Sequence, residues 1–245
     1  MITFPRVVRA EWTKLLSTRT AWLVLLGLPL ALTLLSGLIG WHNRHRPATL
    51  TEAVGGGFLV YALTFGIFGV LFMAGEHSSG LIRTTLLAVP RRLPVLWAKA
   101  VVLFAATLPV LLAGYLGGFL AHQAFATRPR GLGDPGALLA VLGAAEATAL
   151  TAIFGLAVGT LVRGLAGAIG VFVLGLVLLP QALLGSLPTD LHDLVLPYLP
   201  TFALQAMFTT GSPLLLTPGQ GTAVGLGWAI LLLGCAAAML RRREL

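Results

Sequence analysis

Residues 91–122 read RRLPVLWAKAVVLFAATLPVLLAGYLGGFLAH. Basic residues crowd the first part of this stretch, and an almost uncharged apolar run follows over 98–122. A helix needs roughly 20 mostly apolar residues to cross the ~30 Å of hydrocarbon in a bilayer. The pattern is therefore typical of a membrane-spanning helix with a basic flank on one side of the membrane.

Five other stretches have the same apolar character and a similar length. Together they predict six spanning helices, over residues 20–40, 55–75, 98–122, 137–161, 165–185 and 222–240. In the whole chain 57% of residues are hydrophobic and only 10% are charged, whereas about a quarter of a soluble protein is charged. The sequence predicts an all-α integral membrane protein, with one transmembrane domain over 1–245.

The Lys and Arg residues gather on one side of the predicted membrane. That side receives Arg6, Arg9, Lys14, Arg19, Arg83, Arg91, Arg92, Lys99, Arg163, Arg241, Arg242 and Arg243. The other side receives only Arg44, Arg46, Arg128 and Arg130. Because loops rich in Lys and Arg stay in the cytoplasm, we expect two cytoplasmic termini and a bacterial plasma-membrane location.

The net charge of +8 does not indicate nucleic-acid binding. Nucleic-acid-binding proteins gather basic residues on one face, but here these residues lie at the ends of apolar runs. They favour anionic lipid headgroups instead, each cation contributing about 1 kcal/mol near the membrane surface. Cys235 is the only cysteine, which excludes an internal disulfide and a metal site built from several cysteines.

We predict no catalytic, metal or cofactor site in this chain. His42 and His45 lie near Glu52 in sequence, but no clear third ligand shares their element. The glycines at 55–57 lack the Lys and Ser or Thr of a phosphate-binding loop. Segment 186–221, the longest between predicted spans, is too short for an ATPase domain. We therefore expect that the protein itself is not an enzyme.

Residues 5–18 predict an amphipathic helix that lies on the membrane surface. Apolar side chains share one helical face, and Arg6 and Arg9 lie opposite. Glu11 is the exception, because it falls within the apolar face. Its carboxylate needs a cationic partner, a headgroup or a polar surface of another subunit. The apolar run that follows is too long for a secretion signal, so we expect it to remain as the first span.

A cytoplasmic insert separates the second and third predicted spans. Ser78 or Ser79 can begin a helix there, and Pro90 should end it, which predicts about three turns over 78–89. The insert contains several Leu and Ile residues. It must therefore either pack against the bundle or dock into a partner.

Two further features concern packing inside the membrane. Pro29 and Pro109 each remove a backbone hydrogen bond and should bend the first and third spans. Glycines also recur at helical spacing, which allows two helices to approach closely in lipid; they are Gly66, Gly69, Gly114, Gly117, Gly118, Gly155 and Gly159.

The segment 186–221 is partly apolar although it lies between spans. It carries five prolines and two acids, Asp190 and Asp193, among Leu, Val and Phe residues. We predict short re-entrant helices that dip into the outer leaflet before the last span. Such backbone must be covered by protein, because lipid offers it no hydrogen bonds.

Glu146 is the one acid inside a predicted span. It lies roughly 14 Å from the outer end of the fourth helix, where a carboxylate costs a few kcal/mol or more. One interpretation makes it a substrate-pathway group or a proton site. The other makes it a hydrogen-bond partner of Thr148, Thr151 or a neighbouring span.

Several segments, in this order, resemble the permease subunits of type-two ATP-binding-cassette exporters. The similar stretches are 11–19 (EWTKLLSTR), 75–92 (GEHSSGLIRTTLLAVPRR), 155–163 (GLAVGTLVR) and 196–206 (LPYLPTFALQA). Together with the six-span layout, the resemblance covers most of the chain. It implies an elbow helix at the membrane surface, with Glu11, Trp12 and Lys14.

The resemblance also implies that residues 78–89 form a coupling helix seated in a groove of a partner. The coupling residues are Glu76, Ser79, Gly80, Arg83, Thr84, Thr85 and Arg91. The implied partners are a cytoplasmic ATP-binding-cassette ATPase, which binds ATP and magnesium, and a second permease as a homodimer or sister subunit. The implied activity is ATP-driven export, such as efflux of an antibiotic, a small molecule, a peptide or a lipid.

Two other functions remain open from the sequence. An ion- or proton-coupled secondary transporter would use Glu146 as its coupling group and work without an ATPase, usually with internal repeats, which we do not detect. A membrane-embedded enzyme or immunity factor would only bind its target. Copurification of a cassette ATPase distinguishes the exporter from both.

Overall fold

The computed structural model describes residues 3–45, 50–78, 92–162, 164–209 and 216–242, and these are helical nearly throughout. In this described part of the chain, six helices are long and apolar enough to cross a membrane: Arg19–His42, Glu52–Gly75, Leu93–Gln123, Ala137–Leu161, Leu165–Ser186 and Pro218–Arg242. The all-helical, multi-pass membrane architecture is thereby confirmed at this level. The third span begins before the predicted residue 98, because Val95 and Leu96 already pack inside the bundle.

The helices follow one another with short connections. The first half contains α1 (Phe4–Ser17), α2 (Arg19–Trp22), the π-helical η1 (Leu23–Gly27), α3 (Leu28–His42), α4 (Leu50–Gly55), α5 (Phe58–Ser78) and α7 (Arg92–Gln123). The second half contains α8 (Ala137–Leu161), α9 (Leu165–Val173), the π-helical η2 (Leu174–Leu178), α10 (Leu179–Ser186), α11 (Thr189–Val195), the 3₁₀ helix η3 (Leu196–Tyr198), α12 (Pro200–Ala206) and α13 (Pro218–Arg242).

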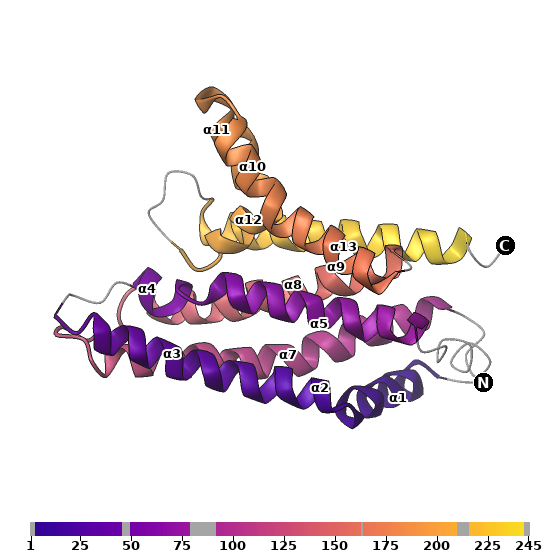
Figure 1. Cartoon of the computed structure of the whole chain (residues 1–245), viewed down its shortest axis with the longest axis horizontal. Helices are drawn as coiled ribbons and strands as arrows, with labels where there is room; N and C mark the ends of the chain where they lie inside the picture. Colours follow the sequence, from indigo (N-terminus) through magenta and orange to yellow (C-terminus); the bar gives the residue numbers. More distant parts are fainter. Residues whose placement is uncertain (1–2, 46–49, 79–91, 163, 210–215, 243–245) are drawn as a thin grey trace.

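Helix α8 is the centre of the bundle. Nearly all of its residues are buried, and it packs against α5, α7, α9 and α13. Both described ends of the chain lie at the same end of the bundle, the N-terminal end with α1 and the C-terminal end with α13 (Figure 1). This arrangement fits an even number of membrane crossings.

Two glycine faces explain the closest helix contacts. A Cβ at Gly155 of α8 would overlap the carbonyl of Gly66 on α5, and one at Gly69 would overlap the carbonyl of Ala152. On α7, Gly114 lies against Pro29 and Gly117 against Thr33 of α3. The predicted close approach of small-residue faces is therefore confirmed at both crossings.

Prolines shape the first and fifth spans. Each π-helical turn ends just before a proline, Pro29 or Pro180. Pro180 has no N–H to offer the carbonyl of Leu176, four residues earlier. The hydroxyl of Thr201 in α12 donates to that carbonyl instead. This bond fastens α12 to span five. Helix α7 continues through Pro109.

The segment before the last span contains short helices, as its composition predicts. Helices α11 and α12 lie in it, joined by η3. Helix α12 packs against α13, whereas α10 and α11 project away from the bundle (Figure 1). Their depth in a membrane stays a prediction.

Candidate functional site

Helix α1 meets the bundle along one buried stripe. Val7, Glu11 and Leu15, spaced four residues apart, are its buried side chains. Val7 packs against Val95 and Ala98 of α7. The backbone turns extended at Thr18 and separates α1 from α2. Thus the helix lies against the start of α7 as a separate element from span one.

The one acid on this stripe is held by two lysines. Lys14 Nζ donates to Glu11 Oε1 at 2.7 Å. Lys99 Nζ of α7 lies 2.7 Å from Oε2, at ion-pair distance but without the angle of a hydrogen bond. The structure therefore gives Glu11 the cationic partner that its position on the apolar face requires, one from its own helix and one from a span.

Lys99 extends the contact to a third helix. Its Nζ donates to the carbonyl of Phe72 on α5 at 3.3 Å and lies 4.1 Å from the centroid of the Phe72 ring. A cation over an aromatic face gains up to about 2 kcal/mol when desolvated. Through Lys99, α1 is tied to both α5 and α7.

The Glu11–Lys99 ion pair is buried, so the loss of one partner affects stability. The Lys99 and Glu11 side chains are 0% and 2% exposed, while the Lys14 side chain is 40% exposed. A buried pair contributes little net stability, but removing one partner typically costs 3–5 kcal/mol because the other charge stays buried. We call Glu11, Lys14, Phe72 and Lys99 the α1 junction.

The α1 junction lies near the ends of the two helices that flank the predicted coupling segment. Phe72 lies six residues before the end of α5, and Lys99 lies seven residues after the start of α7. Helices α5 and α7 border residues 79–91. The junction therefore joins α1 to both helices that flank this segment.

Three tryptophans in α1, α2 and α7 are exposed. Trp12, Trp22 and Trp97 all expose a large part of their rings, and Trp22 Nε1 donates to the Leu16 carbonyl at 2.8 Å. Trp is enriched where hydrocarbon meets water. These rings therefore favour a position for α1 at a membrane interface.

Most of the predicted coupling residues cannot be placed. Ser79, Gly80, Arg83, Thr84, Thr85 and Arg91 lie outside the described residues, as does nearly all of the predicted helix 78–89. Glu76 belongs to α5 by its backbone, but its side chain is not described.

Glu146 lies apart from the junction, in the middle of α8. It shares a partly exposed face with Leu138, Leu139 and Leu142. The Thr148 and Thr151 hydroxyls donate to the Ala144 and Thr148 carbonyls, so a hydrogen bond between Glu146 and Thr148, Thr151 or a neighbouring span stays a prediction. Within the described part of the chain, the Glu146 carboxyl makes no hydrogen bond or ion pair.

Lys99 and Phe72 are the site residues that sequence reasoning missed. The sequence places Lys99 in the basic flank of the third span, although it is the only Lys or Arg inside any of the predicted spans. This isolated position inside a span is the sequence signal that singles out Lys99. Among the described residues no group of three or more His, Cys, Asp or Glu side chains could hold a metal ion.

In comparisons with known proteins, no family model matches this sequence and no curated protein matches it significantly. The function must therefore be argued from the site itself.

Proposed function

We propose that this protein is the membrane-spanning permease subunit of an ATP-driven exporter. It acts as a dimer, forms the substrate pathway, and is driven by a separate cytoplasmic ATP-binding-cassette ATPase, which binds ATP and magnesium. Its termini and the segment 79–91 face the cytoplasm of a bacterium.

The observation that carries this proposal is the α1 junction. A pump needs ATP binding to favour one permease conformation, so the ATPase must contact the permease differently in two states. Force must then pass from a surface contact to the spans. The buried Glu11–Lys99 pair and the Lys99–Phe72 contact connect α1 to the ends of α5 and α7, which supports a proposal in which these three elements move together.

The experiment is affinity purification of the tagged protein in mild detergent from its own host. We expect a cassette ATPase to copurify in stoichiometric amount. Arg83→Glu should reduce its yield at least fivefold, because it reverses a charge in the proposed docking helix. Arg128→Glu is the matched control, since Arg128 is exposed in the loop between α7 and α8. Absence of an ATPase, or equal losses in both variants, would contradict the proposal.

One observation favours a second candidate, an ion- or proton-coupled secondary transporter. Glu146 lies inside a span with no partner among the described residues, and such acids are typical of proton relays. This function predicts substrate transport by the purified protein alone in vesicles, driven by a proton gradient without ATP. Transport that requires the ATPase would exclude it.

A further inference from the structure

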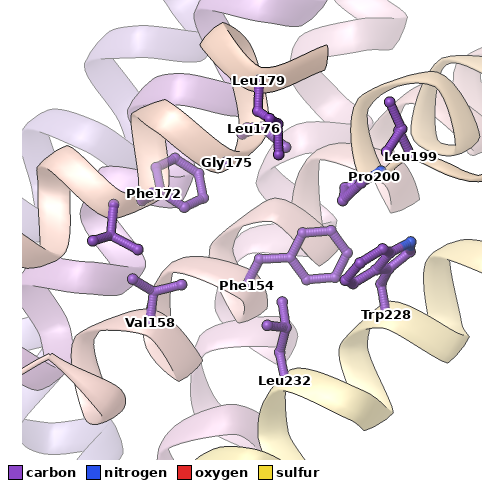
Figure 2. A pocket seen from close by; sticks show the side chains of 11 residues that line it. Phe154, Val158, Phe172, Gly175, Leu176, Leu179, Leu199, Pro200, Trp228 and Leu232 are labelled. Carbon is purple, nitrogen blue, oxygen red and sulfur yellow. The ribbon is translucent and has the colours of Figure 1, made fainter. Parts of the chain in front are cut away.

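A cavity of about 250 Å³ lies between α8, span five, α12 and α13 (Figure 2). Its walls include Phe154 of α8, Phe172 and Leu176 of span five, Leu199 and Pro200 near α12, and Trp228 of α13. No charged side chain lines it. The only polar side-chain atom in its wall is Trp228 Nε1, which already donates to the Tyr198 carbonyl at 2.9 Å.

Two hydrogen bonds and one glycine of span five shape the cavity. Thr201 holds α12 at the Leu176 carbonyl, and the Tyr198 carbonyl fixes the Trp228 indole. Between these two anchors, Gly175 contributes no side chain, and a Cβ built there meets no atom within 4 Å. The polar contacts thus fix the walls, while Gly175 leaves the space between them open.

The mouth of the cavity faces away from the bundle. Val171 and Leu179 line the cavity and are each 48% exposed. They are eight residues apart on span five, which is about 12 Å along a helix. Trp228 lies ten residues inside α13, about 15 Å from its start and so near the middle of a ~30 Å hydrocarbon layer. The mouth therefore opens where lipid chains lie.

The apolar walls of the cavity and the depth of its mouth favour an acyl chain of the surrounding lipid as its occupant. Apolar cavities of this kind do not hold water. A second copy of this chain on the same face would keep lipid chains out of the cavity, which the test below detects. We propose that this cavity binds one acyl chain of a membrane phospholipid. The inference rests on the membrane location alone and does not depend on an ATPase.

The test uses Trp228 as a reporter of lipid contact. The other four tryptophans, Trp12, Trp22, Trp41 and Trp97, are all exposed, so each can be replaced by Phe. The purified variant is reconstituted into phosphatidylcholine vesicles with or without bromine at the middle of the acyl chains. Bromine quenches Trp fluorescence only at contact distance. We expect strong quenching of Trp228.

Two matched substitutions decide where the quenching chain lies. Gly175→Leu fills the cavity and should at least halve the quenching. Gly170→Leu, on the exposed surface of the same span, also meets no atom within 4 Å and should leave quenching unchanged. If Gly175→Leu does not fold, Val158→Phe fills the cavity from α8. Absent quenching in the parent, or equal quenching in parent, filled and control proteins, would overturn the proposal.

Discussion

At the scale of single residues, the buried Glu11–Lys99 ion pair gives a direct prediction about stability. Glu11→Gln should lower the free energy of unfolding by about 3–5 kcal/mol, because the Lys99 charge stays buried without its carboxylate. Lys14→Met is the control and should cost less than about 1 kcal/mol, since Lys14 is partly exposed. The measurement is reversible unfolding in detergent micelles.

A double variant tests the cause of this loss. Glu11→Gln with Lys99→Met removes both charges, so most of the lost stability should return. If the double variant is as unstable as Glu11→Gln alone, the loss comes from packing and not from an isolated charge. If Lys14→Met is as harmful as Glu11→Gln, burial is not what matters.

A second prediction at the scale of single residues concerns Glu146. Glu146→Gln keeps the shape of the side chain and removes its charge. We expect export to fall at least tenfold while expression and dimer assembly stay normal, because the carboxyl has no structural partner among the described residues. Export assays in cells, beside blots of membrane fractions, measure this. Unchanged export at equal expression removes Glu146 from the pathway.

At the scale of elements, the α5–α8 crossing depends on glycine. Gly155→Ala places a methyl group into the Gly66 carbonyl, so the helices must separate. Overpacking of this kind costs about 1–3 kcal/mol or more. Gly234→Ala in α13 is the matched control, because a Cβ there meets no atom. Thermal unfolding in detergent should show a lower midpoint for the first variant only, and equal midpoints would contradict this packing.

The sequence predicts the spanning elements well, for a physical reason. A run of apolar residues has to satisfy its backbone within a helix, so hydropathy alone locates the six spans. Helix α1 follows from periodicity, because its apolar residues share one face, while its position at the membrane surface stays a prediction. The close glycine faces follow from spacing alone, although their partners do not.

Other features depend on contacts between distant residues and could not be predicted. One of the two partners of Glu11, Lys99, lies on another helix; its isolation inside a span marks it as unusual, but no local pattern pairs it with Glu11. Thr201 also acts across a long distance in sequence, because its hydroxyl donates to the Leu176 carbonyl that Pro180 leaves without an N–H. Neither Pro180 nor Thr201 is unusual when read alone.

At the scale of the whole molecule, orientation is the first question. In a Cys235→Ala background, Thr3→Cys and Arg128→Cys each give one exposed thiol at opposite ends of the bundle. A membrane-impermeant maleimide should label residue 128 in intact cells and residue 3 only after permeabilisation, because the basic flanks stay inside. The reverse pattern would invert the topology.

The bundle also divides into buried and exposed spans. Span four is buried on nearly every side, whereas spans one, five and six expose many apolar side chains. In a membrane these exposed faces meet lipid or another protein chain. They do not meet water, which is why a chain with so much exposed Leu and Ile is stable there.

The central claim is that the segment between α5 and α7 transmits force from an ATPase. The most direct measurement is site-specific photo-crosslinking in cells, with a photoreactive residue at position 83 and a control at position 128. We predict an adduct with a cassette ATPase from position 83 and none from position 128. Adducts confined to the protein's own chain, in cells that still export, would contradict the claim.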